Sequence, residues 1–222
     1  MATVLITGAN RGIGLALARA YVERGDTVIG ACRLTSEALD ALGVTVYEGV
    51  EVSDDAAVDG LATALGDTRI DILVNNAAIH SNETLEDLSF ERIRKQFEVN
   101  TLGPLRVTRS LLPRLHEGSK VVIVTSRSGS IGDNGSGNTY GYRISKAAVN
   151  MAGVNLALDL KPRGIPVLLL HPGMVKTDMG GKGNPAAVEA KDAAARMVAR
   201  IDELSLANTG QFQHAEGHEL PW

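Results

Sequence analysis

Residues 4–25, "VLITGANRGIGLALARAYVERG", constrain the fold more than any other stretch of the sequence. A short apolar run leads into a glycine-rich turn, and a segment of helical period follows. Gly8, Gly12 and Gly14 have the spacing G-x-x-x-G-x-G rather than the G-x-G-x-x-G of the commonest dinucleotide fingerprint. Glycines at such a turn let backbone N–H groups approach a pyrophosphate at the positive end of the next helix. The stretch therefore predicts a dinucleotide-binding turn, with an ordinary strand-to-helix turn as the alternative.

The rest of the chain alternates between short β-branched runs and segments of helical period. Runs that are apolar on both faces are typical of a parallel sheet covered by helices. We therefore predict an α/β fold: a doubly wound, Rossmann-type parallel sheet of about seven strands with helices on both faces, in a single domain over residues 1–222. The predicted strands are 4–7, 27–32, 44–47, 70–75, 120–126 and 166–171, and the predicted helices are 14–23, 54–65, 90–115, 142–160 and 186–204.

The composition argues against several classes of protein. The chain is 44% hydrophobic and 22% charged, as is ordinary for a globular protein, and its net charge of −4 argues against a nucleic-acid partner. The single cysteine, Cys32, argues against a disulfide framework or a Cys-rich metal site. The N-terminal apolar run is too short for a signal peptide, and no run approaches the roughly 20 residues of a membrane span. We expect a cytoplasmic protein without a membrane partner.

The end of the second predicted strand bears on the choice of dinucleotide. NAD sites usually place an acidic side chain about 20 residues beyond the glycines, where it binds the ribose 2′-hydroxyl. Here "IGACRL" brings Arg33 to that region, and no acid follows before Glu37. A guanidinium suits a 2′-phosphate, and Arg11 in the glycine turn would add a second positive charge. We predict NADP(H) rather than NAD(H); the alternative is that both arginines are solvated surface residues.

Six blocks in the right order make the whole chain resemble the short-chain dehydrogenase/reductase family. They are "TGANRGIG" (7–14), "NNAA" (75–78), "VN" (99–100), "VTS" (124–126), "YRISK" (142–146) and "HPGMVKTDM" (171–179). The C-terminal "TGQFQHAEGHELPW" is similar to the small carbonyl-reductase-like branch that contains C-factor and Sniffer-type proteins. The resemblance implies hydride transfer between a nicotinamide and a small-molecule carbonyl or secondary alcohol. It also implies a homodimer or homotetramer built through the helices 90–115 and 142–160.

The resemblance assigns roles to individual residues. Tyr142 corresponds to the acid/base, Lys146 to its partner, and Ser126 to the serine that hydrogen-bonds the substrate oxygen. Asn100 corresponds to the asparagine that supports a water-linked proton relay. The implied cofactor-binding residues are Gly8, Asn10, Arg11, Gly12, Ile13, Gly14, Arg33, Glu51, Val52, Asn76, Ala77, Tyr142, Lys146, Pro172, Gly173, Val175 and Thr177.

Three departures from the family pattern affect the site. Ala78 stands where glycine is common, and Glu51 replaces the usual aspartate of an adenine-contacting pair. The interval from Ser126 to Tyr142 is 16 residues, longer than usual, so a loop must bulge near the substrate entrance. Ser128 is an alternative catalytic serine. We prefer Ser126 because it ends a strand directly, where open α/β sheets place their ligands.

The chemistry of carbonyl reduction needs a proton for the oxygen as well as a hydride. A free tyrosine, with a pKa of about 10, is a weak acid–base partner at neutral pH, and a nearby lysine ammonium lowers that pKa. Ser126 would stabilise developing negative charge. Tyr142 and Lys146 are one helical turn apart and share a face. Tyr140 would point elsewhere, or precede a helix capped at 138–139, and is expected at the wall or entrance of the site.

The histidines are weaker candidates. His171 is expected to be structural, and His80 either lines the substrate pocket or lies on the surface. His214 and His218 are four residues apart, but the sequence around them predicts strand and turn rather than helix, so we expect no metal site.

Two further functions remain open at this stage. A dinucleotide-binding sensor or signalling protein with little turnover would share the fold. An NAD-preferring dehydrogenase would follow if Arg33 does not reach the cofactor. The complete set of serine, tyrosine, lysine and asparagine favours the NADP(H)-dependent oxidoreductase, because a pure binder has no chemical need for all four.

Overall fold

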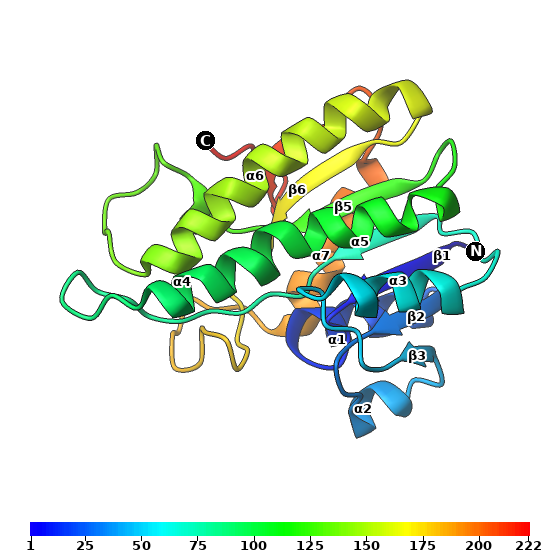
Figure 1. Ribbon diagram of the computed structural model, residues 1–222, viewed down its shortest axis with the longest axis horizontal. Coiled ribbons are helices and arrows are strands. Elements are labelled where there is room, and N and C mark those ends of the chain that lie inside the picture. Colours follow the sequence, from blue (N-terminus) through cyan, green and yellow to red (C-terminus); the bar gives the residue numbers. More distant parts are fainter.

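The computed structural model describes residues 1–222 and contains one seven-stranded parallel sheet with helices on both faces (Figure 1). The strand order is β3-β2-β1-β4-β5-β6-β7, and every neighbouring pair is parallel. The predicted doubly wound fold is confirmed. The strands are β1 (Thr3–Thr7), β2 (Thr27–Ala31), β3 (Thr45–Tyr47), β4 (Ile72–Asn75), β5 (Lys120–Val124), β6 (Val167–His171) and β7 (Phe212–His214). The α-helices are α1 (Gly12–Glu23), α2 (Glu37–Asp40), α3 (Asp55–Ala64), α4 (Phe90–Phe97), α5 (Gly103–Leu111), α6 (Tyr140–Leu160) and α7 (Ala190–Glu203).

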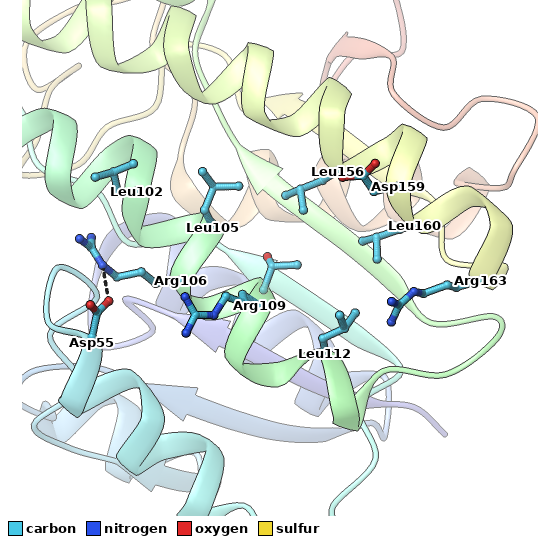
Figure 2. A pocket seen from close by; sticks show the side chains of 11 residues that line it. Asp55, Leu102, Leu105, Arg106, Arg109, Leu112, Leu156, Asp159, Leu160 and Arg163 are labelled. Carbon is cyan, nitrogen blue, oxygen red and sulfur yellow. Dashed lines mark hydrogen bonds and ion pairs between the residues drawn. The ribbon is translucent and has the colours of Figure 1, made fainter.

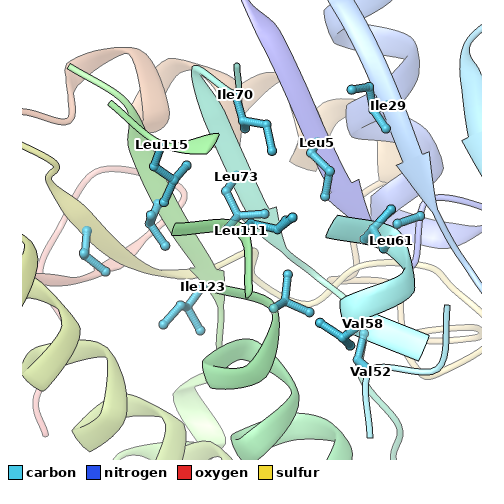
Figure 3. Close-up of a cluster of buried hydrophobic side chains, with 14 of the residues drawn as sticks. Leu5, Ile29, Val52, Val58, Leu61, Ile70, Leu73, Leu111, Leu115 and Ile123 are labelled. Atoms are coloured by element: carbon cyan, nitrogen blue, oxygen red, sulfur yellow. The ribbon is translucent and has the colours of Figure 1, made fainter. Parts of the chain in front are cut away.

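Two hydrophobic cores of similar size, 21 and 20 buried residues, lie on the two faces of the sheet. Successive strand residues point to opposite faces, so Leu5 joins one core while Val4 and Ile6 join the other. The first core packs under α3, α5 and α6, and Figure 3 shows Leu5, Leu73 and other members of it. The second packs under α1 and α7. This double burial is why the strands are apolar without alternation.

The predicted helix 90–115 is helical without a break over residues 90–114, but it is not α-helical throughout. A π-helical turn, Glu98–Leu102, joins α4 to α5, and a 3₁₀ turn, Leu112–Arg114, follows α5. Pro104 has no N–H to donate to the carbonyl four residues back, which removes an α-helical bond at this point. Gly103 also packs closely on Val52, since a Cβ at Gly103 would lie 2.9 Å from a Val52 methyl carbon. The π turn carries Asn100.

Other helix ends differ by a few residues from prediction. α3 begins at Asp55, one residue later than predicted, and the Asp54 carboxylate caps it by accepting from the Ala56 N–H at 2.8 Å. α6 begins at Tyr140, two residues earlier than predicted, after Thr139 in a left-handed conformation. α7 begins at Ala190, after an irregular segment. The short α2, which the sequence did not predict, begins at the Ser36 cap. None of the helices combines the length and apolarity needed to cross a membrane.

The loops after β4, β5 and β6 gather at one end of the sheet, on the left of Figure 1. In a parallel sheet this is the carboxyl end of every strand. The strand order reverses between β1 and β4, and open α/β sheets bind ligands in the crevice at such a point. The fold therefore places the candidate site at this end.

Candidate active site

The turn between β1 and α1 requires its glycines. Gly8 and Gly12 have φ values of 67° and 57°, in the left-handed region that side chains disfavour. The Gly8 N–H donates to the Ala31 carbonyl at 2.7 Å, which joins the turn to the end of β2. A Cβ at Gly14 would lie 2.2 Å from the Gly8 carbonyl oxygen. The three glycines thus make a backbone surface that no other residue type permits.

The start of α1 is open to an anion. No side chain caps its first N–H groups, and its first turn contains no acidic residue. Such an end has unpaired donors and a partial positive charge. Together with the glycine cradle, it fits the pyrophosphate of a dinucleotide.

Polar side chains hold the β1 turn against the β4 turn. The Thr7 hydroxyl accepts from the N–H groups of Asn76 and Ala77 at 3.0 and 3.1 Å. The Asn76 amide donates to the carbonyls of Thr7 and Gly8 at 3.0 and 3.2 Å. Asn76 and Ala77 therefore line the predicted cofactor crevice and also set its shape.

The two arginines expected at the cofactor are exposed. Arg33 lies just beyond β2, with its guanidinium 3.5 Å from the Glu51 carboxylate. Arg11 lies 3.8 Å from Asp178, with both side chains mostly in solvent. Exposed pairs at such distances are weak, so both guanidiniums remain available to a phosphate. Ser36, which the sequence did not single out, donates from its hydroxyl to the Asn10 carbonyl at 2.7 Å and so holds α2 against the glycine turn.

Ser126 follows β5 and is 8% exposed. Its hydroxyl accepts from the Ser128 N–H at 3.1 Å, so Ser128 forms part of the turn that orients Ser126. The Ser126 side chain also interacts with the Tyr142 phenol and acts to lower its pKa. This geometry favours Ser126 over Ser128 as the serine at the reacting group.

Tyr142 and Lys146 lie on one face of α6, one turn apart, as expected. Burial raises the pKa of Tyr142, and this outweighs the opposing effect of Ser126. The sequence argument expected the lysine to lower that pKa, but in this structure desolvation of the phenol dominates. Lys146 is only 3% exposed, and burial lowers its pKa to about 8. Its ammonium donates to the Val124 carbonyl at 2.9 Å, at the end of β5.

Asn100 is buried in the π-helical turn, and its amide makes three hydrogen bonds. Its oxygen accepts from the Ile79 N–H, and its nitrogen donates to the Ile79 carbonyl, both at 2.8 Å. The nitrogen also donates to the Ser145 hydroxyl at 3.0 Å. Asn100 thus joins the loop after β4 to the residue beside Lys146. π-helical turns often occur at functional sites.

The turn after β6 completes the edge of the crevice. Pro172 is buried, and Gly173 has a φ of 85° with its missing Cβ position 3.3 Å from the His214 ring. Thr177 approaches the glycine turn, since a Cβ at Gly12 would lie 3.5 Å from its methyl group. Val175 is buried at the base of this segment. The remaining members of the predicted cofactor set lie beside those described above, on the first turn of α1 and next to Glu51.

The structure separates the histidines into two groups. His80 packs edge-on against Tyr142 with ring centres 4.8 Å apart, so it lines the site rather than the surface. His214 and His218 stack with ring centres 4.7 Å apart across a tight turn; the sequence predicted the strand and the turn but not the stacking. Glu216 lies within 4.8 Å of both. However, the Glu216 carboxylate binds the Arg196 guanidinium at 2.8 Å, and His214 Nδ1 accepts from the Glu216 N–H at 3.1 Å. Both groups therefore already have partners within the protein.

A cavity of about 640 Å³ lies away from these catalytic candidates (Figure 2). Leu102, Leu105 and Leu112 face Leu156 and Leu160 across it, between the α5 and α6 segments. Its rim is charged, with an ion pair between Arg106 and Asp55 at 2.7 Å. None of the predicted catalytic residues lines it.

Comparison with known proteins agrees with this geometry. A family model described as short chain dehydrogenase matches residues 2–187. The chain is 44% identical to the 1-hydroxy-2-glutathionyl-2-methyl-3-butene dehydrogenase of Rhodococcus sp. (strain AD45), over the whole of both chains. It is 43% identical to the C-signal protein of Myxococcus xanthus, over 69% of this chain and 93% of that protein.

Two solved structures are similar along the entire chain. The NADPH-bound carbonyl reductase from chicken fatty liver matches with a TM-score of 0.92 and 28% identity, covering 100% of this chain and 99% of that one. The carbonyl reductase Sniffer of D. melanogaster matches with a TM-score of 0.92 and 29% identity, covering 100% of both chains. The predicted branch, with C-factor and Sniffer-type relatives, is confirmed.

Proposed function

The chain belongs to the short-chain dehydrogenase/reductase family, and from that premise we propose that it is an NADP(H)-dependent oxidoreductase with Tyr142 as its acid/base. Its substrate class is a small-molecule carbonyl or secondary alcohol. The observation that carries the proposal is the convergence of Ser126, Tyr142 and Lys146 at the carboxyl end of β5.

The cofactor site is supported by the glycine turn, the uncapped start of α1 and the two exposed arginines. Gly8, Gly12 and Gly14 would hold the pyrophosphate, and Arg33 with Arg11 would bind the 2′-phosphate. The NADPH in the chicken carbonyl reductase supports the same choice. When bound, the nicotinamide supplies the hydride, and the protein supplies position and proton.

The protein's own groups would manage the oxygen of the substrate. Ser126 would donate a hydrogen bond to the carbonyl oxygen, and Tyr142 would transfer its phenolic proton to that oxygen as negative charge develops. Lys146 would stabilise the phenolate left behind, because its ammonium is held nearby by the Val124 carbonyl. Asn100 would anchor a proton relay beside Lys146 through Ser145.

The protonation of Tyr142 bears on the pH dependence of the reaction. Burial raises the pKa of its phenol, which therefore holds its proton to higher pH than a free tyrosine does. Alcohol oxidation needs the phenolate as a base, and it would become faster as the pH rises. Lys146, with a pKa of about 8, would still be mainly charged at pH 7.

The experiment that tests this proposal is a substrate panel assayed by NADPH oxidation and NADP⁺ reduction. The panel contains ketones, aldehydes and secondary alcohols. It also contains an alcohol that carries a glutathione thioether, because the Rhodococcus relative is named for a glutathionyl alcohol. Turnover of a carbonyl or alcohol supports the proposal. NADPH binding without any turnover would favour the second candidate.

That second candidate is a dinucleotide-binding signalling protein, and the similarity to a protein named C-signal favours it. Such a protein would need the cofactor crevice but not the proton-transfer groups. Tyr142→Phe separates the two functions, since it would leave a signalling activity intact and remove an enzymatic one.

A homodimer or homotetramer is the proposed assembly. Ile144, Met151 and Leu158 are 48%, 65% and 65% exposed and recur every seven residues along α6. That period places them on one stripe of the helix. These exposed side chains on α6 and, separately, the leucine-lined cavity between α5 and α6 (Figure 2) are apolar surfaces that support association with a second copy of the chain.

A further inference from the structure

Glu83 is a carboxylate with no exposed surface, on the loop between β4 and α4. Fully buried acidic side chains are rare unless they are paired or hydrogen-bonded. Glu83 takes no part in the proposed proton transfer, and its burial therefore needs another reason.

Both carboxylate oxygens of Glu83 face donors. One oxygen accepts from the Gly141 N–H at 3.1 Å. The other accepts from the Gln96 amide at 3.2 Å and from the Ser81 hydroxyl, and it lies 3.7 Å from the Arg92 guanidinium. An ionised carboxylate accepts at both oxygens, which matches this ring of donors.

The bond to Gly141 caps the helix that carries Tyr142. Thr139, at the cap position of α6, has a φ of 46° and makes no side-chain cap of its own. The Thr139 N–H instead donates to the backbone carbonyl of Glu83 at 2.7 Å. Glu83 therefore satisfies two donors at the start of α6 and places negative charge at the positive end of the helix.

Close packing leaves little freedom at this cap. A Cβ at Gly141 would lie 2.1 Å from the Gln96 amide nitrogen, so α6 and α4 are in direct contact there. The Gln96 oxygen accepts from the Ser81 N–H at 3.0 Å, which closes the network. Tyr142 is the next residue after Gly141.

The same loop is also anchored at its other end. Ile79 is held by Asn100, and Glu83 is held by Gly141, so His80 lies between two fixed points. Its ring then packs edge-on against Tyr142. The loop thus contacts the Tyr142 ring through His80 and holds the residue before it, Gly141, through the helix cap.

We propose that Glu83 is a positioning residue that sets the start of α6, and with it the orientation of the Tyr142 phenol, by accepting from the N–H of Gly141. The inference rests on the proposed role of Tyr142. A misplaced acid/base slows the chemical step more than it weakens cofactor binding, because small errors in the geometry of a reacting group can cost up to about 100-fold in rate.

The test is Glu83→Gln, which keeps the shape but must place an NH₂ donor against either Gly141 or Gln96. With a substrate identified in the panel, we expect kcat to fall by roughly 10- to 100-fold while the NADPH Kd stays within about twofold. Asp87→Asn is the matched control, because Asp87 also binds Arg92, at 3.1 Å, but is exposed and makes no hydrogen bond to α6. Its kcat is expected to match the wild type.

Two results would overturn the inference. One is an unchanged kcat in Glu83→Gln; the other is a parallel loss of kcat and NADPH binding, as a general loss of folding would give. Amide hydrogen exchange over residues 139–143 gives an answer independent of turnover: protection must fall in Glu83→Gln and not in Asp87→Asn. An inactive wild type would count against the proposed function, and retained protection in Glu83→Gln would count against the cap.

Discussion

The ammonium nitrogen of Lys146 lies 5.7 Å from the centre of the Tyr142 ring, and its hydrogen bond goes to the Val124 backbone rather than to the phenol. The end of β5 therefore fixes the position of the charge, and α6 brings the ring to it. This arrangement keeps a cation near the tyrosine without a carboxylate partner that would neutralise it.

We expect Tyr142→Phe to abolish carbonyl reduction and to leave NADPH binding intact, because only the phenolic hydroxyl is lost. Tyr140→Phe is the matched control, since Tyr140 is the first residue of the same helix. It is expected to retain substantial rate. Steady-state kinetics and fluorescence titration of NADPH check both variants, and an inactive Tyr140→Phe would disprove the assignment.

Lys146→Met is expected to stabilise the cofactor-free protein at pH 7. Burial lowers the pKa of Lys146 to about 8, against 10.5 for an ordinary lysine, so below pH 8 the fold bears the full cost of a buried charge. That cost is about 3 kcal/mol, and it disappears as the pH rises through 10.5, where the unfolded chain also loses the proton. The variant also leaves the Val124 carbonyl without its hydrogen-bond donor, which lowers the free energy of unfolding by about 1 kcal/mol.

Lys146→Met should therefore raise the free energy of unfolding by about 2 kcal/mol at pH 7, and this increase should vanish or reverse near pH 10.5. Urea unfolding at both pH values measures it, and Lys161→Met, at an exposed lysine, serves as the control with little change at either. A loss of stability at pH 7 would show that the buried ammonium is stabilising.

Arg33→Ala is expected to raise the Kd for NADPH by about tenfold or more, because a charge-assisted hydrogen bond contributes roughly 1.5–3 kcal/mol. The Kd for NADH, which lacks the 2′-phosphate, should hardly change. Fluorescence titration with both nucleotides measures the difference. Arg69→Ala, at an exposed arginine before β4, is the control; equal effects of Arg33→Ala on both nucleotides would contradict the prediction.

Gly14→Ala should destabilise the protein by about 1–3 kcal/mol and impair dinucleotide binding, since the new methyl group would lie 2.2 Å from the Gly8 carbonyl oxygen. Gly60→Ala, in α3, meets nothing within 4 Å and is expected to stabilise slightly. Thermal unfolding and NADPH titration compare the two. A Gly14→Ala variant that binds normally would mean that the turn can move.

Met151→Glu and Leu158→Glu are expected to shift the protein toward the monomer, because each places a charge on the exposed apolar stripe of α6. Leu206→Glu, at a 39% exposed leucine beyond α7, is the control and should leave the assembly unchanged. Size-exclusion chromatography with light scattering gives the mass. A wild-type protein that is already monomeric would exclude the proposed interface.

The sequence predicted the sheet and the main helices because their signals are local. Apolar β-branched runs, helical periods and the glycines of the first turn can be recognised from residues that are neighbours in the sequence. The one-turn spacing of Tyr142 and Lys146 is of the same kind, and it singled out Tyr142 over Tyr140. The predicted helix 90–115 was found over residues 90–114, but the π turn at Asn100 was not predicted; Pro104 and the packing of Gly103 against Val52 lie beside it.

The residues that the sequence analysis missed act over long distances. Glu83 meets Gly141 across 58 positions, and Ser36 meets Asn10 across 26, and neither pair has a recognisable spacing. The sequence could not predict the raised pKa of Tyr142. It showed a lysine that would lower this pKa, but it did not show how deeply the phenol is buried. The sequence by itself determined the fold class and supplied the proposed reacting groups, since backbone preferences and side-chain chemistry are properties of the residues. Only the tertiary structure decided how those groups are buried, capped and oriented, because burial and capping depend on contacts between segments that are distant in the chain.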